Sequence, residues 1–489
     1  MLPNPIPSTK DTLGFDHYRE ELTRQGRLPD IGAPKRGANE PVRQPSDRVN
    51  IVWFMADQLR ADVFGFAGHP FVQTPNLDRL AAKGTAFTRS YCNSPVCGPA
   101  RASMMTGTYL NDHGVLQNNF RMRPEATVFP KIFEEHGYRT ASIGKTHCGR
   151  GSQEIWGQSQ NPQDAFGATM PASTSFNPDH FPDAVYLHHQ VSPNPNRLLY
   201  GRYPAPVDVT KSYRIVTEAM KWIYYNQDPR PFFLRLSFDD PHPPVVPPEP
   251  FYSMYDPEEV PDALVADVQE SLQQKPRVFQ EYRERMGSAA LTEADHRKHA
   301  AVYLGFVSHV DAQIGRFLDY YEQSEFAANT IYVVNSDHGH YIGEHGFAGK
   351  GVGLHEGVTR IPTVVAWPGK LPEGRTSAVL TDGTDLMPTL LELAGIEVPA
   401  GIRGRSLVPV LREERDRHKE ALFLQWSDFG FSLVRDEWKL IWYISDNEGE
   451  LYHLGNDPGE KSNRIDDPAL ESIRRSMMEE LEQLRQSTP

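Results

Sequence analysis

Two apolar stretches of the chain end in residues that can bind a metal ion. One ends in Asp57-Gln58 and the other in Asp337-His338. Carboxylate and amide oxygens are hard ligands that suit Ca²⁺, Mg²⁺ or Mn²⁺. An aspartate after a strand is more often a turn or helix cap, but the carboxyl ends of parallel strands meet at one edge of a sheet, where two such residues converge. The two pairs therefore predict a divalent metal site.

A cysteine stands where a turn leads into a predicted helix. Cys97 is followed by Gly98, Pro99 and, one helical turn on, Arg101. A thiol at a helix start beside an arginine is typical of a low-pKa nucleophile, whereas an isolated cysteine is more commonly a small buried thiol. The proline and glycine fix a turn and let backbone approach a ligand closely. The pattern favours a reactive site at Cys97 without selecting the reaction.

Four further residues can offer a positive charge or a proton. Lys145 and Lys350 each follow a glycine, and His147 and His242 lie in predicted loops. Lysines are usually solvated, and a loop histidine is more often bonded to protein groups than catalytic. An acidic chain that handles an anion nevertheless needs cations at its site, and these lysines are the candidates.

Strands that alternate with helices must position these residues. Three near-continuous apolar runs, typical of strands buried on both faces of a parallel sheet, lie at residues 49–56, 231–238 and 330–336. Helical patterns lie between them, at residues 74–83, 126–136, 212–225 and 293–322. This alternation predicts an α/β sandwich with a mostly parallel central sheet.

The pattern changes after about residue 400. Short alternating strands are predicted at 421–426, 431–435, 438–443 and 450–454, followed by an amphipathic helix from about 468 to 485. We expect three parts: a polar, proline-rich N-terminal arm at 1–48 with one short helix at 17–25, a catalytic domain at 49–400, and a small C-terminal α+β domain with an antiparallel sheet at 401–489.

Composition excludes several classes of protein. The 489 residues carry 50 Lys+Arg against 64 Asp+Glu, a net charge of −14 that argues against a nucleic-acid or anionic-membrane binder. The three cysteines are too few for a disulfide framework, and Cys92 and Cys148 are expected to be structural. The first residues do not resemble a signal peptide and no stretch is long enough to span a bilayer, so we expect a soluble, cytoplasmic protein.

The order of the motifs resembles the type I sulfatases of the alkaline phosphatase superfamily. The likeness rests on Asp57-Gln58, Cys97-x-Pro99-x-Arg101, Gly144-Lys145-x-His147, Pro241-His242-Pro243, Ser336-Asp337-His338-Gly339 and Gly349-Lys350, in this order. The segment from Glu450 to Asn463 is similar to the C-terminal signature of the family. The resemblance covers about residues 49 to 464 and implies an alkaline-phosphatase-like α/β/α sandwich that hydrolyses sulfate esters.

By this resemblance, a formylglycine-generating enzyme oxidises Cys97 to formylglycine, whose hydrated aldehyde attacks sulfur and forms a covalent sulfo-enzyme intermediate. The implied ligands of one Ca²⁺ or Mn²⁺ ion are Asp57, Gln58, Cys97, Asp337 and His338. Arg101 and Lys145 would hold the formylglycine oxygens, and His147 would act as base on the second hydroxyl. His242 and Lys350 would grip the sulfuryl oxygens and help the leaving oxygen depart.

Three positions depart from the commonest sulfatase pattern. Asp57-Gln58 replaces paired aspartates, His338 replaces asparagine, and Ala100 replaces serine. This set resembles the phosphonate monoester hydrolases, so hydrolysis of phosphonate monoesters or phosphodiesters at the same centre is the alternative. Lys145 and His147 differ from those hydrolases and favour sulfate esters. The imidazole of His338 makes Mn²⁺ a rival to Ca²⁺, because imidazole is softer than carboxylate.

Two functions of other classes stay open: a non-catalytic anion binder with unmodified Cys97, and a hydrolase that uses the Cys97 thiolate without a metal. Substrate contacts are expected from residues 151–206 and 247–289. The candidates are Trp156, Phe176, Tyr186 and Arg197, with His340, His345 and His355 close to the site in sequence. The N-terminal arm offers a surface for packing on a neighbouring subunit in a homo-oligomer.

Overall fold

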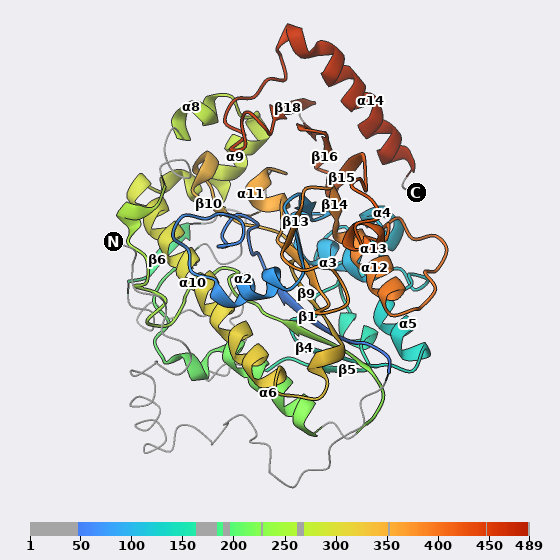
Figure 1. The fold of residues 1–489 in the computed structure, drawn as a ribbon. Coiled ribbons are helices and arrows are strands. Elements are labelled where there is room, and N and C mark those ends of the chain that lie inside the picture. Colours follow the sequence, from blue (N-terminus) through green and yellow to red (C-terminus); the bar gives the residue numbers. More distant parts are fainter. Residues whose placement is uncertain are drawn as a thin grey trace.

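A computed structural model describes residues 47–162, 183–188, 196–225, 228–261, 268–350, 353–445 and 447–487. Its centre is an eight-stranded sheet (Figure 1). The strand order is β13 (Arg375–Ser377), β2 (Thr85–Phe87), β12 (Thr363–Ala366), β9 (Thr330–Ser336), β1 (Asn50–Ala56), β8 (Phe232–Ser237), β4 (Arg139–Gly144) and β5 (Gln158–Gln160). β12 is antiparallel to both neighbours, and the other pairs are parallel. The three predicted apolar strands are thus β1, β8 and β9, side by side.

β1 is an unbroken apolar run because both of its faces are buried. Val52 and Phe54 face a core cluster on one side of the sheet, whereas Ile51, Trp53 and Met55 face a second cluster on the other side. Since successive side chains of a strand point to opposite faces, both faces of the sheet are covered by apolar groups.

Helices supply those two covers. On one face lie α2 (Pro75–Ala82), α6 (Lys211–Tyr225) and α10 (Glu293–Tyr321), and on the other lie α3 (Cys97–Thr106), α5 (Phe129–Glu135) and α12 (Leu386–Leu393). α10 begins at a capping box in which Thr292 and Asp295 bond to each other's backbone N–H groups. The predicted α/β/α sandwich is confirmed, and four of these helices begin and end within a few residues of their predicted bounds.

A second, four-stranded antiparallel sheet follows. It contains β15 (Ala421–Trp426), β16 (Gly430–Arg435), β17 (Trp438–Tyr443) and β18 (Glu448–His453). One face packs against α14 (Glu471–Ser487), and the other packs against residues of the larger unit such as Tyr341 and Phe347. The antiparallel C-terminal sheet is as predicted. The side chains of α13 (Val408–Leu411) belong to the core of the larger unit.

The short helix expected at residues 17–25 lies outside the described residues. Among the residues that are described, no helix has both the length and the apolar character required to cross a membrane.

Candidate active site

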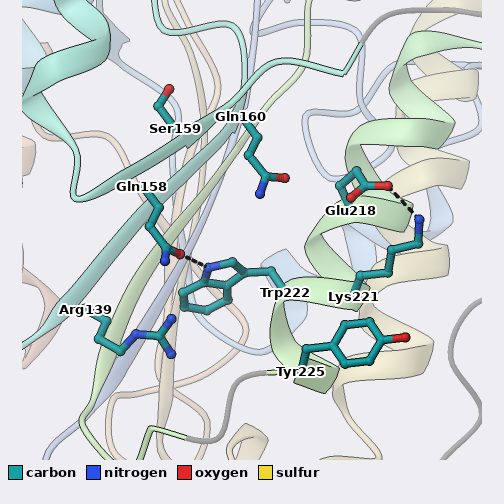
Figure 2. Close-up of a pocket in the computed structure, with 8 residues that line it drawn as sticks. All are labelled: Arg139, Gln158, Ser159, Gln160, Glu218, Lys221, Trp222 and Tyr225. Atoms are coloured by element: carbon teal, nitrogen blue, oxygen red, sulfur yellow. Dashed lines mark hydrogen bonds and ion pairs between the residues drawn. The ribbon is translucent and has the colours of Figure 1, made fainter.

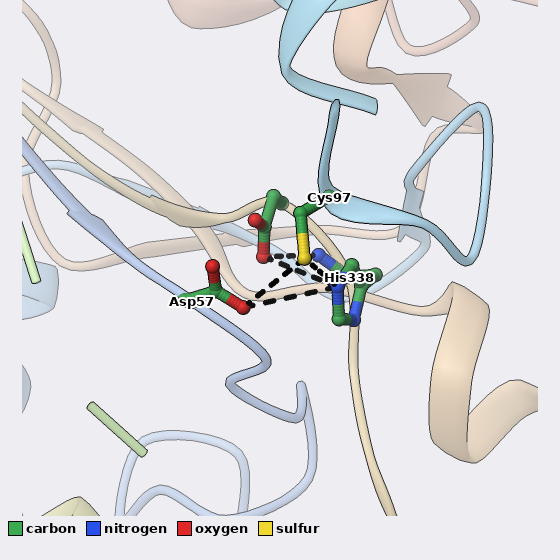
Figure 3. A group of neighbouring side chains, drawn as sticks. Asp57, Cys97 and His338 are labelled. Atoms are coloured by element: carbon green, nitrogen blue, oxygen red, sulfur yellow. Dashed lines mark hydrogen bonds and ion pairs between the residues drawn. The ribbon is translucent and has the colours of Figure 1, made fainter. Parts of the chain in front are cut away.

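The ends of β1 and β9 bring four side chains together. Asp57 follows β1, Asp337 and His338 follow β9, and Cys97 begins α3. One ligand atom from each of these residues lies within 4.8 Å of those of the others, and all four residues are buried. Figure 3 shows Asp57, Cys97 and His338 pointing toward one another. The register that pairs Ala56 with Ser336 sets the two acidic strand ends at the same level of the sheet.

Cys97 is held at this point by the turn that precedes α3. Val96 has an extended backbone and its carbonyl accepts the first helical bond, from the N–H of Ala100 at 3.0 Å. The N–H of Gly98 donates to Oδ1 of Asn118 at 2.9 Å. A Cβ atom at Gly98 would lie only 2.9 Å from the same oxygen, so the glycine lets the two segments approach. The thiol sulfur then lies 3.5 Å from Oδ1 of Asp57 and 3.2 Å from Nε2 of His338.

Arg101 ties the two carboxylates together. Its Nε donates to Asp337 at 2.7 Å and its Nη2 donates to Asp57 at 3.2 Å. Nη1 donates to Oγ of Ser237 at 2.9 Å and to the carbonyl of Lys145 at 3.0 Å. Four of the five N–H donors of the guanidinium are engaged in this way. Arg101 is therefore bonded to both carboxylates and to the ends of two strands, and it orients the aspartates.

Two lysines approach the same group from different loops. Nζ of Lys145 bonds to Asp57, and Nζ of Lys350 lies 2.6 Å from Sγ of Cys97 and 2.9 Å from Nε2 of His338. Lys145 follows Gly144, whose φ of +103° is a left-handed conformation. A Cβ there would lie 2.0 Å from the carbonyl oxygen of Ser237, so glycine is required where β4 ends.

These cations set the electrostatics of the site. Burial raises the pKa of the Cys97 thiol, but Lys350, Lys145 and His338 outweigh it and hold that pKa well below its usual value. Burial and the adjacent sulfur raise the pKa of Asp57, yet Lys145 and the other nearby cations lower it below its usual value. The local charge therefore favours an anion at residue 97 although the whole chain is acidic.

Both predicted histidines lie at residue 97. His147 lies close enough to Cys97 to help lower the pKa of the thiol. His242 also interacts with Cys97, and burial and Lys350 lower the pKa of its ring. Nδ1 of His242 lies 2.6 Å from the carbonyl of Pro243, so Nδ1 donates its proton there and Nε2 is the ring nitrogen left for the site.

Gln58 shows that the donor set fits a metal ion. Its backbone N–H donates to Oδ1 of Asp337 at 3.0 Å and its side-chain nitrogen bonds to His340. Oε1 of Gln58 is buried and has no hydrogen-bond partner among the described residues. Nδ1 of His338 lies 2.8 Å from the carbonyl of Gly339, which directs the lone pair of Nε2 to the cluster. An unused amide oxygen, two carboxylates and an imidazole lone pair are suitable ligands for a divalent cation.

Sequence reasoning missed two residues that support this site, Ser237 and Asn118, and considered His340 only as a contact for substrate. Ser237 is the last residue of β8 and lies beside Met55 of β1, so the strand-end argument that found Asp57 would also have found it. Asn118 carries no signal in the sequence, because its contact with Gly98 depends on the path of a loop.

Several residues that were expected to contact substrate have other surroundings. Trp156 is a core residue whose ring packs on Phe233 and beneath the guanidinium of Arg235. His345 lies 3.2 Å from Oγ of Ser271, so it is bonded within the protein.

Two of the remaining candidates for substrate contact are also bonded within the protein. His355 bonds to Lys275 and Glu450, and His340 bonds to Gln58. Phe176 lies outside the described residues. Arg197, in contrast, interacts electrostatically with Cys97 and with Tyr282, and therefore remains a candidate for contacting substrate.

A pocket elsewhere contains none of the expected site residues. It has a volume of about 620 Å³ and lies at the β5 edge of the central sheet, where Trp222 of α6 donates to Gln158 (Figure 2). Lys221 pairs with Glu218 on the same helix. Two pairs of the lining residues are thus bonded to each other, and the residues predicted to carry the chemistry lie at the strand ends instead.

An α/β/α sandwich whose strand ends gather two carboxylates, an imidazole and a helix-initiating cysteine defines the sulfatase class of the alkaline phosphatase superfamily. The chain belongs to the sulfatase family, whose model matches residues 49–396, and by this membership it is a sulfuric ester hydrolase. The family described as N-sulphoglucosamine sulphohydrolase, C-terminal, matches residues 343–487.

Known relatives agree with this assignment. The chain is 28% identical to an arylsulfatase from Clostridium perfringens over 464 residues, covering 88% of this chain and 94% of that protein. It is 27% identical to a multifunctional alkaline phosphatase superfamily protein from Trinickia caryophylli, covering 87% and 93%. Its fold is similar to that of the phosphonate monoester hydrolase of Agrobacterium radiobacter, with a TM-score of 0.77 and 24% identity over 90% of this chain and 96% of that chain.

Proposed function

We propose that this sulfatase hydrolyses sulfate monoesters and that residue 97, converted from cysteine to formylglycine, is its nucleophile. The observation that carries the proposal is the position of Sγ of Cys97, within 4.8 Å of ligand atoms of Asp57, Asp337 and His338. The sulfur stands where an oxygen of the hydrated aldehyde would be. Similarity to an arylsulfatase supports a sulfate ester as substrate.

The ligands of a single Ca²⁺ or Mn²⁺ ion would be Asp57, Gln58, Asp337 and His338, together with residue 97. Such an ion would lower the pKa of the attacking hydroxyl and neutralise charge that develops on the sulfuryl oxygens. Arg101 keeps both carboxylates in position through its bonds to Asp57 and Asp337.

The remaining side chains would transfer protons and stabilise negative charge. The attacking hydroxyl of residue 97 would lose its proton to solvent, and its oxygen would then bond to sulfur as the S–O bond to the alcohol breaks. His242, protonated on Nε2 as well as Nδ1 when the anionic ester is bound, would give the Nε2 proton to the departing oxygen, while Lys350, which lies against Sγ of Cys97, holds the sulfuryl oxygens. His147 then takes the proton of the second hydroxyl of residue 97, so that the C–O bond to sulfate breaks, sulfate leaves and the aldehyde forms again. One water adds to the aldehyde and restores the hydrated form for the next cycle.

Hydrolysis of phosphonate monoesters or phosphodiesters at the same centre is the second candidate. The residues that favour it are Gln58 and His338, which depart from the commonest sulfatase pattern, and a multifunctional relative that is 27% identical supports it. Sulfate monoesters, phosphodiesters and phosphonate monoesters each carry one negative charge, so one pocket can accept all of them.

One set of assays tests the proposal. Purified protein is assayed on an aryl sulfate and on a phenyl phosphonate monoester, with and without a metal chelator, beside the Cys97→Ala and His147→Ala variants. We expect the aryl sulfate to be the better substrate and expect both variants and chelation to abolish turnover. A better phosphonate substrate would select the second candidate. Full activity in the presence of chelator would select a thiolate mechanism, and no activity on any ester would leave an anion binder.

A further inference from the structure

One face of α10 holds Gln58 at two points. His299 and Tyr303 are four residues apart and therefore lie on the same side of this helix. The hydroxyl of Tyr303 donates to the backbone carbonyl of Gln58 at 2.8 Å and accepts from the N–H of Arg60 at 3.1 Å. Gln58 has a φ of +69°, a conformation that residues other than glycine rarely adopt, so its backbone needs such support.

The second point of attachment is a chain of hydrogen bonds that reaches the side chain. The amide nitrogen of Gln58 bonds to Nδ1 of His340, and Nε2 of His340 lies 3.2 Å from Nε2 of His299. The His340 ring is stacked on the Tyr303 ring, with 4.8 Å between centroids and an angle of 5° between planes. Gln58 is thus bound through both its backbone and its amide to residues that α10 supports.

The hydrogen bonds from Gln58 through His340 to His299 must all run in one direction, because each ring nitrogen either donates or accepts. Both rings are buried, and the two Nε2 atoms face each other at hydrogen-bond distance. A neutral imidazole has one donor nitrogen and one acceptor nitrogen. If the Gln58 nitrogen donates to Nδ1 of His340, the His340 proton is on Nε2 and is donated to Nε2 of His299, whose own proton is then on Nδ1.

An amide ligand needs such a device where a carboxylate does not. Both oxygens of a carboxylate can bind a cation, whereas an amide that is rotated by half a turn presents two N–H donors to the ion. The partner of the amide nitrogen therefore decides whether a glutamine is a ligand. Oε1 of Gln58 is buried and has no hydrogen-bond partner among the described residues, as this orientation requires.

We propose that His340, supported by His299 and Tyr303, is a positioning residue. It keeps the amide oxygen of Gln58 directed at the metal position that Asp57 and Asp337 would share with it. The inference rests on the part of the proposed function in which these residues hold a divalent ion.

The proposal is tested by isothermal titration of the whole protein with Ca²⁺ and with Mn²⁺, which measures its metal affinity. In His340→Phe the ring that stacks on Tyr303 is kept and the acceptor for Gln58 is removed. We expect affinity to fall roughly ten- to a hundredfold, the usual effect of removing a partner of a metal ligand. The control is His309→Gln, which replaces a buried histidine of α10 that lies near Thr210, and it should bind as the wild type does.

A double-mutant cycle separates positioning from a general structural role. In the Gln58→Glu background either carboxylate oxygen can bind the ion, so His340→Phe should cost much less affinity than it does beside Gln58. Equal costs in the two backgrounds, or unchanged affinity in His340→Phe alone, would overturn the proposal. A wild-type protein that binds neither metal would refute the metal centre itself, which is a distinguishable result.

Histidine tautomers provide a test that needs no variant to fold. Nitrogen NMR of the wild-type protein should show His340 protonated on Nε2 and His299 protonated on Nδ1. The opposite tautomer at His340 would mean that the Gln58 oxygen accepts from it, and the proposal would be wrong. His299→Leu serves as a second variant. We expect it to lose less metal affinity than His340→Phe, because His299 acts on Gln58 only through His340. A larger loss would contradict this order of the hydrogen bonds.

Discussion

The Sγ atom of Cys97 lies 3.2 Å from Nε2 of His338, although 241 residues separate the two positions in the chain. The contact exists because α3 begins above the carboxyl end of the sheet, where β1 and β9 run side by side in parallel. A nucleophile on a helix start and ligands on strand ends are thereby held by rigid elements. Such placement favours precise geometry, which loops alone would not provide.

Arg101 is expected to be a major source of stability. Its side chain and those of Asp57 and Asp337 are fully buried. Arg101→Met would leave two carboxylates without their bridging cation, and we expect the free energy of unfolding to fall by about 3–5 kcal/mol. Denaturant titration with a chelator present measures this. The exposed pair of Arg79 with Asp319 provides the control, since Arg79→Met should cost about 1 kcal/mol or less. Equal effects of the two variants would refute the bridging role.

Asp311 predicts a specific pH dependence of stability. It accepts bonds from the backbone N–H groups of Asn76 and Leu77 at the start of α2, and burial raises its pKa to about 7. Between about pH 4 and pH 7 the folded protein then keeps a proton that the unfolded chain has lost. Asp311 should therefore contribute a decrease of about 1.4 kcal/mol per pH unit to the free energy of unfolding as pH rises through this window.

The Asp311→Asn variant should lack this part of the pH dependence. Melting temperatures at several pH values measure the difference from the wild type. Asp319 lies on α10, as Asp311 does, but is exposed, so Asp319→Asn should leave the profile unchanged. Parallel profiles for wild type and Asp311→Asn would show that Asp311 is ionised throughout the window.

His242 is expected to matter most for poor leaving groups. If it donates a proton to the departing oxygen, His242→Gln should lower kcat by roughly 10²–10⁴ for an alkyl sulfate. The loss should be far smaller for a nitrophenyl sulfate, whose leaving group needs little protonation. Steady-state assays on a series of esters measure the trend. A uniform loss across the series would instead indicate a role in binding.

Arg197 is expected to recognise a second negative charge of the substrate. Burial lowers the pKa of its guanidinium, which interacts electrostatically with Tyr282 and with Cys97. For a sulfate ester that also carries a carboxylate or a second sulfate, Arg197→Gln should raise KM by about tenfold or more. The KM for a neutral aryl sulfate should change less. Arg202→Gln is the matched control, because Arg202 is more exposed and lies 3.7 Å from Asp183.

The sequence was sufficient to predict the elements and the core of the site, because both follow local rules. Apolar runs define β1 and β9, and residues directly after parallel strands must share an edge, which is why Asp57 and Asp337 were found. Contacts that depend on loop paths were not predictable. Lys275 follows no motif and would be assigned to the surface, yet it is buried against His355, Glu450 and Tyr452.

The role of a predicted residue was harder to assign than its position. Arg101 was expected to hold formylglycine oxygens, and the structure reveals its bonds to Asp57 and Asp337, which no spacing rule indicates. The partner of Gln58 was also hidden, since His340 was considered only as a contact for substrate. Such pairings depend on the directions of side chains, and the sequence pattern does not encode these.

The chemical state of residue 97 tests the account most directly. Trypsin should release residues 90–101, which contain both Cys92 and Cys97. Mass spectrometry of this peptide from protein that is active on an aryl sulfate should reveal formylglycine at residue 97 and an intact thiol at Cys92. Fully active protein in which Cys97 is an unmodified thiol would contradict the proposed mechanism.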